Sequence, residues 1–165
     1  DGVINIDKNF IYEVKDFEFV NGIFETCIAL IKLNYKLIII TNQSGIARVY
    51  YNEKDFQKIT QWMLDQFKCR NIDIHDIFYC PHGPKSSCSC RKPKPGMFID
   101  AQLKHKIDMS KSWMIGDKES DIKASNDAGI SNTILLKSIH ENNEKEHKAK
   151  FIINNIEEVV NIITS

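Results

Sequence analysis

Apolar positions along the chain follow two alternating periodicities. Runs with apolar residues three or four positions apart, which are typical of amphipathic helices, lie at 22–34, 53–68, 95–104 and 156–163, and a further helix is expected to follow the acidic loop 116–121 and to close near 128–129. Short continuous apolar runs, which are typical of strands buried on both faces of a parallel sheet, lie at 37–40, 77–79, 113–115, 133–136 and 151–153. This alternation predicts an α/β fold in which a central parallel sheet is covered by helices in a three-layer, Rossmann-like arrangement.

Length and charge limit what such a fold can do. The 165 residues suffice for one substantial core, so a single domain spanning 1–165 is expected, without a large cap domain. Lys plus Arg equals Asp plus Glu at 22 each, so no overall field attracts nucleic acid or a membrane surface, and an anionic ligand must be bound locally. No apolar run approaches the roughly 20 residues of a membrane span. We therefore expect a monomer without nucleic acid or membrane partners.

The most distinctive stretch is residues 78–95, which read FYCPHGPKSSCSCRKPKP. Two pairs of metal-ligating side chains flank a short polar loop at 80–90: Cys80 with His82, and Cys88 with Cys90. Three thiolates and an imidazole suit a tetrahedral Zn²⁺ site, and in extended backbone the two members of each pair point the same way. The alternatives are a disulfide or unrelated thiols. The clustering favours a structural zinc loop.

Two further cysteines lie outside this loop. Cys27 and Cys69 fall in helical patterns without a nearby partner. We expect both to be buried thiols in a reducing compartment, which favours a cytoplasmic location.

Polar residues suited to phosphate binding stand at the ends of the predicted strands. Thr41-Asn42 follows one strand, Arg91-Lys92 follows the zinc loop, and Asp117 follows another strand. Asp1 stands where a preceding strand should end. Because ligands of open α/β sheets bind at the carboxyl ends of the strands, these residues are expected to converge there.

The convergence would bring together the groups that phosphoryl chemistry needs. Two carboxylates suit Mg²⁺, and Mg²⁺ with Lys92 and Thr41 would surround a phosphoryl group. Taken singly, each residue has a plainer interpretation: a turn for Asp-Gly, a helix cap for Thr-Asn, a solvated charge for lysine and a helix start for Gly-Asp. Their occurrence at successive strand ends favours the phosphoryl site.

Four motifs in order resemble the haloacid dehalogenase (HAD) superfamily. They are DGVIN at 1–5, TNQSGIAR at 41–48, CRKPKPGM at 90–97 and GDK at 116–118. Together with the zinc loop, they resemble the D-glycero-D-manno-heptose 1,7-bisphosphate 7-phosphatases of the histidinol-phosphatase-like subfamily. The resemblance covers about the whole chain, and its most specific part is the zinc loop joined to Arg-Lys-Pro.

The resemblance implies a role for each matching residue. Asp1 corresponds to the general acid that protonates the departing sugar oxygen and then acts as base on water. Asp1 and Asp117 correspond to Mg²⁺ ligands, whereas Thr41 and Lys92 correspond to stabilisers of the phosphoryl group. The residues that correspond to contacts with a small sugar phosphate are Asp7, Asn42, Gln43, Ser44, Arg91 and Lys118. Asp121 could orient the Mg²⁺ shell or only stabilise a helix start.

The nucleophile of the family is an aspartate two positions before the second aspartate of the first motif. Asp1 corresponds to that second aspartate, so the position of the nucleophile falls immediately upstream of Asp1. We therefore expect an apolar strand ending in Asp-x before Asp1. Val49 is a second departure, because it stands where related sequences usually carry glycine.

The implied activity is hydrolysis of the C7 phosphate through an aspartyl-phosphate intermediate, giving heptose 1-phosphate for nucleotide-activated heptose synthesis. Three alternatives stay open on the sequence alone. They are a histidinol-phosphate phosphatase, a DNA 3′-phosphatase and, if the nucleophile were truly absent, a zinc-stabilised binding domain without enzymatic activity. The balanced charge disfavours the DNA enzyme, which should carry a basic footprint.

Overall fold

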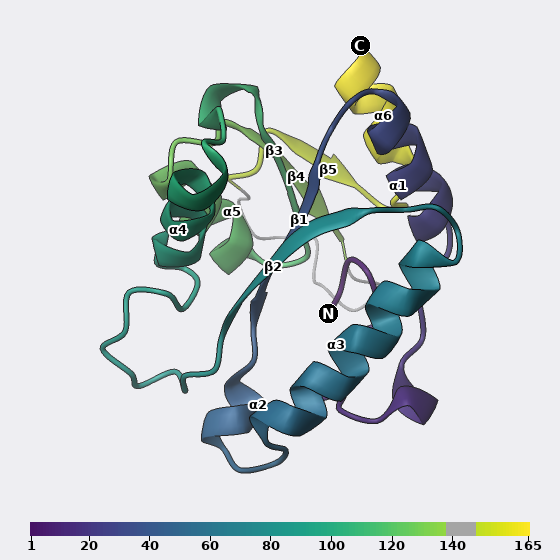
Figure 1. The fold of residues 1–165 in the computed structure, drawn as a ribbon. Helices are drawn as coiled ribbons and strands as arrows, with labels where there is room; N and C mark the ends of the chain where they lie inside the picture. Colours follow the sequence, from purple (N-terminus) through teal and green to yellow (C-terminus); the bar gives the residue numbers. More distant parts are fainter. Residues whose placement is uncertain (138–147) are drawn as a thin grey trace.

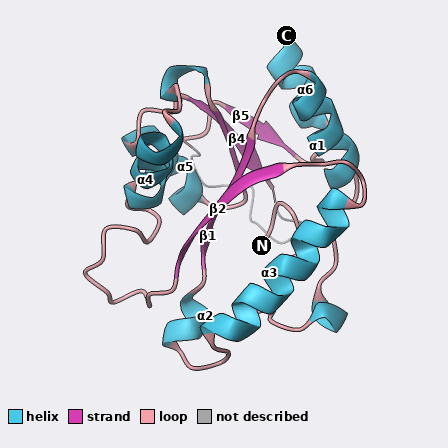
Figure 2. Ribbon diagram, in the orientation of Figure 1, coloured by secondary structure: helices cyan, strands magenta, loops and turns pink. Residues whose placement is uncertain are grey.

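In the computed structural model, which describes residues 1–137 and 148–165, helices and strands alternate along the chain (Figures 1 and 2). The helices are α1 (Ile23–Lys32), α2 (Ser44–Ala47), α3 (Glu53–Lys68), α4 (Gly96–His105), α5 (Glu119–Asp127) and α6 (Glu158–Thr164). The strands are β1 (Leu37–Asn42), β2 (Ile74–Cys80), β3 (Trp113–Gly116), β4 (Asn132–Leu136) and β5 (Phe151–Ile153). Short 3₁₀ helices lie at Val14–Asp16 and Met109–Lys111. The predicted α/β class is confirmed.

Local signals account for where the longest helices begin. α3 starts with a capping box, because the side chain of Asn52 accepts from the N–H of Asp55 and the Asp55 carboxylate accepts from the N–H of Asn52. α1 instead follows Gly22, which has a φ of 81°. A side chain at Gly22 would also collide with Glu157, so this helix start needs glycine. The N-cap of α1 is this glycine and not the polar Asn21 before it.

The strands form two parallel sheets rather than one central sheet. β1 pairs with β2 in one sheet, and the other has the order β3-β4-β5. Within the described residues, no strand pairs with the second edge of β1 or of β3. Residues of both strands, including Ile38, Ile40, Trp113 and Ile115, line a cleft of about 600 Å³. The prediction of parallel strands holds, but this cleft divides them.

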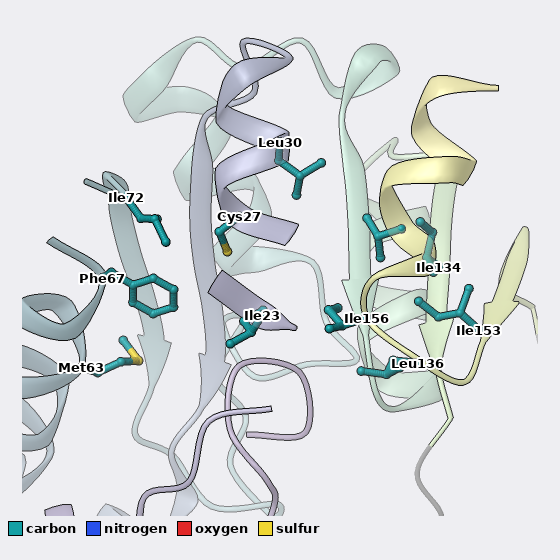
Figure 3. Close-up of a cluster of buried hydrophobic side chains, with 11 residues drawn as sticks. Ile23, Cys27, Leu30, Met63, Phe67, Ile72, Ile134, Leu136, Ile153 and Ile156 are labelled. Carbon is teal, nitrogen blue, oxygen red and sulfur yellow. The ribbon is translucent and has the colours of Figure 1, made fainter. Parts of the chain in front are cut away.

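Helices cover the strands on two sides, with α1, α3 and α6 on one side and α4 and α5 on the other (Figure 1). The larger core joins α1, α3, β4 and the C-terminal segment, and it contains the fully buried side chains of Phe67 and Ile134 (Figure 3). Replacing such a core phenylalanine by alanine costs about 3–5 kcal/mol of stability. A smaller core under α4 and α5 contains Phe98 and Ile130.

One sequence expectation about burial was wrong, and the N-terminal segment adds to the core. Val3, Phe17 and Phe19 pack against the larger core. Cys27 is buried as expected, but Cys69 is exposed because it caps the C-terminal end of α3. No helix in the described part of the chain has both the length and the apolar character needed to cross a membrane.

Candidate active site and metal sites

The carboxyl ends of β1 and β3 place the predicted phosphoryl-binding residues around one end of the cleft. Asp1, Thr41, Lys92 and Asp117 all line it. The four residues thus converge from separate segments, as the sequence analysis expected. Their chemical roles stay predictions.

Lys92 is held by contacts at both its backbone and its side chain. Its ammonium lies 2.7 Å from Asp121 Oδ1 and donates to the carbonyl of Ile40 on β1 at 2.7 Å. The Asn42 amide donates to the Lys92 carbonyl and accepts from the Lys92 N–H, both at 3.1 Å. Lys92 is only 8% exposed, so its buried charge needs the Asp121 carboxylate as a partner. Asp121 stabilises a helix start, as one of its two expected roles required, because its Oδ2 accepts from the N–H of Lys118 at 3.1 Å in the capping box of α5. Its Oδ1 also holds Lys92. A role toward Mg²⁺ stays a prediction.

Asp117 is equally buried, with 9% exposure, but less well compensated. Burial raises the pKa of its carboxyl group; the charge of Lys118 lowers the pKa, and that of Asp121 raises it again. The nearest oxygen lies 3.4 Å from the Lys118 ammonium. A buried carboxylate with a raised pKa, whose nearest ammonium is 3.4 Å away, is a ligand that a divalent cation stabilises, so Asp117 fits Mg²⁺. Asp1 as a second ligand stays a prediction.

The segment 1–5 folds tightly against Asp117. Gly2 has a φ of 81°, and a Cβ at this position would lie 2.0 Å from Asp117 Oδ2, so only glycine fits. The buried side chain of Asn5 donates to Asp1 Oδ1 at 2.8 Å. Asn5 thereby orients the carboxylate that is expected to act as general acid. Sequence reasoning gave Asn5 no role, although it stands within the first motif.

The other predicted substrate contacts surround this edge. Lys118 donates to Asp7 at 2.8 Å, and this hydrogen bond and charge outweigh burial to lower the pKa of Asp7. Ser44 begins α2, and Arg91 donates to the carbonyl of His82 at 3.1 Å. The side chains of Asn42 and Gln43 are engaged inside the protein, the latter with Thr41 and Tyr51. Contact of these residues with substrate stays a prediction.

The predicted zinc ligands form a compact cluster. The ligand atoms of Cys80, His82, Cys88 and Cys90 all lie within 4.8 Å of one another. Cys80 Sγ is 3.8 Å from Cys88 Sγ and 3.0 Å from Cys90 Sγ. Zinc at about 2.3 Å from each sulfur requires sulfurs roughly 3.8 Å apart, so small adjustments would complete a tetrahedron. All described cysteines are free, which excludes the disulfide alternative for them.

The charges in the cluster also fit a bound cation. Burial and the neighbouring sulfurs raise the pKa of Cys90 to about 12. Burial also acts to raise the pKa of Cys88, but hydrogen bonds from Ser86 and the Arg91 backbone lower it to about 6. Thiolates this close repel one another unless a metal ion lies between them. Lys94 braces the loop by donating to the Cys88 carbonyl at 2.6 Å.

Comparisons with known proteins identify the family of this chain. A HAD-hydrolase-like family model matches residues 89–159. The chain is 44% identical over 164 residues to the D-glycero-beta-D-manno-heptose-1,7-bisphosphate 7-phosphatase of Photorhabdus laumondii, covering 94% of this chain and 87% of that protein. It is 45% identical over 163 residues to the corresponding alpha-heptose enzyme of Campylobacter jejuni, covering 98% and 90%. The chain belongs to the heptose-1,7-bisphosphate 7-phosphatase family.

Similarity to a solved structure extends this assignment to the fold. D,D-heptose 1,7-bisphosphate phosphatase from B. bronchiseptica, in complex with magnesium and phosphate, superposes with a TM-score of 0.87. The two sequences are 26% identical, and the match covers 99% of this chain and 94% of that one. The predicted HAD fold and phosphatase class are confirmed. These relatives are not named as histidinol or DNA phosphatases, so those alternatives are not favoured.

Within this family site, sequence reasoning missed one buried side chain beside the phosphoryl-binding residues. Tyr51 is 6% exposed, and its hydroxyl donates to Gln43 Oε1 at 2.5 Å. It lies three residues after Arg48, the last residue of a recognised motif, and nothing in the local pattern distinguishes it from the adjacent, exposed Tyr50. Only the packing of the chain separates the two tyrosines.

Proposed function

We propose that this protein is a Mg²⁺-dependent phosphatase that removes the C7 phosphate from D-glycero-D-manno-heptose 1,7-bisphosphate and releases heptose 1-phosphate. The observation that carries the proposal is the convergence of Thr41, Lys92 and Asp117 around one cleft, in a chain of the heptose bisphosphate phosphatase family. The zinc loop supports the choice of substrate, because it holds Arg91, the residue before Lys92, through a hydrogen bond to the carbonyl of His82, and Arg91 would serve as a cation for the sugar phosphate.

Each residue contributes to the reaction by its position. Lys92 and Thr41 stabilise the charge of the phosphoryl group, which is the main need of such transfers. Asp1, oriented by Asn5, donates a proton to the departing C7 oxygen and then accepts one from the attacking water. Asp1 and Asp117 would hold Mg²⁺, which neutralises phosphate charge when bound. Structural Zn²⁺ would be held by Cys80, His82, Cys88 and Cys90.

We further propose that residues before Asp1 form a strand in the cleft between β1 and β3 and supply the nucleophilic aspartate. Residues of both strands line this cleft, and within the described residues neither strand has a strand neighbour on this edge, so backbone groups there need partners. The aspartate would attack phosphorus as the bond to the C7 oxygen breaks, and water would then hydrolyse the aspartyl phosphate to restore the carboxylate.

The strand is tested by producing the protein with its native upstream residues. We expect phosphatase activity and a sheet that is continuous from β2 to β5. Replacing the upstream aspartate by asparagine should abolish turnover while preserving the melting temperature. A native upstream sequence without an apolar segment ending in aspartate would contradict the proposal.

The substrate is tested by phosphate release from both anomers of the heptose bisphosphate, from fructose 1,6-bisphosphate and from histidinol phosphate. We expect the highest kcat/KM with a heptose bisphosphate. Preference for either other compound would overturn the substrate assignment. Both anomers are needed because the P. laumondii and C. jejuni relatives carry different anomeric names at similar identity. Cytoplasmic location and a monomeric state stay predictions.

A further inference from the structure

Tyr51 occupies a fixed position behind the phosphoryl-binding edge. Its ring stacks on Tyr12, with centroids 5.6 Å apart and planes inclined by 21°. On another side the ring packs on Gly45 so closely that a Cβ there would lie 2.1 Å from it. A buried ring held between an aromatic neighbour and a glycine has little freedom to move. The position of its hydroxyl is therefore well defined.

The hydroxyl of Tyr51 begins a chain of hydrogen bonds that ends at Thr41. It donates to Gln43 Oε1 at 2.5 Å, and Gln43 Nε2 donates to Thr41 Oγ1 at 3.1 Å. Burial raises the pKa of Tyr51. The N–H of Gly45 donates to the Tyr51 oxygen, which lowers the pKa by less, so the pKa is raised overall. Tyr51 is therefore a neutral phenol at pH 7, and it directs its proton to Gln43.

The direction of this chain matters for Thr41. An amide can lie either way round, and a reversed Gln43 would make its oxygen accept the hydroxyl proton of Thr41. With Gln43 Oε1 turned to Tyr51, the Thr41 oxygen accepts instead. Within the described residues, Thr41 Oγ1 donates no hydrogen bond. Its proton is thus available to a group in the cleft that Lys92 and Asp117 also line.

We propose that Tyr51 is a positioning residue, which fixes the Gln43 amide so that the Thr41 hydroxyl donates to the phosphoryl group undergoing transfer. This inference rests on the proposed phosphatase function. Tyr51 itself touches no reacting atom, and its effect passes through Gln43.

The test is the Tyr51→Phe variant of the phosphatase with its native upstream residues, assayed with p-nitrophenyl phosphate and Mg²⁺. This substrate has no sugar, so the result is independent of the heptose assignment. Losing one orienting hydrogen bond should lower kcat about 5- to 10-fold with KM nearly unchanged. Tyr50→Phe is the matched control, because Tyr50 is exposed and its hydroxyl makes no hydrogen bond within the described residues. It should retain the parent kcat.

A double-mutant cycle separates positioning from simple packing. Gln43→Ala removes the intermediary, so adding Tyr51→Phe to it should lower kcat no further. If the two losses multiply instead, Tyr51 acts independently of Gln43 and the proposal is wrong. It is equally overturned if Tyr51→Phe lowers the melting temperature but keeps full kcat well below that temperature. Activity on p-nitrophenyl phosphate without activity on heptose bisphosphate would remove the substrate assignment and leave this inference intact.

Discussion

Lys92 and Asp117 are buried to nearly the same degree at neighbouring loop tips, yet the Lys92 charge is closely paired and the Asp117 charge is not. Lys92 has a carboxylate and a carbonyl each 2.7 Å from its ammonium. Asp117 has its nearest ammonium at 3.4 Å, on the more exposed Lys118, and Asp121 adds repulsion. Burial of a charge is costly unless it is paired. The charge of the cationic tip is thus compensated within the chain, whereas that of the acidic tip would be compensated by the Mg²⁺ that we propose it binds.

This difference predicts that the two tips respond in opposite ways to substitution. A change at the acidic tip should abolish function without loss of stability. A change at the cationic tip should reduce both.

The largest effect is expected from Asp117→Asn. Activity should fall at least about 1000-fold, because Mg²⁺ contributes several kcal/mol of transition-state stabilisation. Mg²⁺ should also no longer raise the melting temperature, while stability in EDTA should equal or exceed that of the parent. Calorimetry with and without Mg²⁺ measures this, and Asp100→Asn, at an exposed position, is the control. Lower stability of Asp117→Asn in EDTA would contradict the comparison.

The same variant has a defined pH dependence. The pKa of Asp117 is raised in the folded protein, so its protonated form contributes stability that is fully present below the unfolded value of about 3.9. That contribution is lost as the pH rises through the folded pKa. In EDTA, the advantage of Asp117→Asn over the parent should therefore grow as the pH is raised from about 4 toward neutrality.

At the cationic tip, Asp121→Leu should remove about 3–5 kcal/mol of stability, because it leaves the Lys92 ammonium buried without its partner. The double variant Lys92→Met with Asp121→Leu should recover most of this loss, since an apolar pair replaces an ion pair. It should stay inactive. Urea denaturation measures the free energies, and a double variant no more stable than Asp121→Leu would mean that packing, rather than charge, is the cause.

Cys88→Ser should remove zinc and lower kcat/KM about 10- to 100-fold, because Arg91 and Lys92 follow the cluster directly. If Arg91 recognises the substrate, this loss of kcat/KM should come mainly from a higher KM. Metal analysis with steady-state kinetics tests this. Cys69→Ser, at an exposed thiol outside the cluster, should change neither quantity.

The smallest effect is expected at Val49, which is 88% exposed and has a φ of 60°. A β-branched residue is strained in this left-handed region, so Val49→Gly should gain about 1 kcal/mol of stability. Val49→Ala should gain less, because it keeps a Cβ. Chemical denaturation compares the three proteins. Equal stability of all three would show that the turn carries no strain.

Much of the fold and the site could be predicted from local patterns. The 3.6-residue spacing of Phe56, Ile59, Met63 and Phe67 defined α3 to its ends, since those side chains are its buried face. The motifs also indicated which residues would gather, because the carboxyl ends of parallel strands share one edge. The Cys/His cluster that could hold zinc was found because its spacing is short and its chemistry is distinctive.

Other features could not be derived, because they depend on contacts between distant segments. The partner of Lys92 is Asp121 on α5, and the partner of Lys118 is Asp7 in the N-terminal segment before α1. The strands form two sheets because, within the described residues, no strand lies between β1 and β3. The local patterns of β1 and β3 do not reveal this gap.

The sequence by itself determined the α/β class, the zinc ligands and the groups available for phosphoryl chemistry, because periodicity and spacing act over a few residues. Only the tertiary structure decided which buried charges are compensated, and it alone separated the buried Tyr51 from the exposed Tyr50. The reason is physical: burial and pairing are properties of a site built from several segments, and the local sequence of any one segment does not contain them.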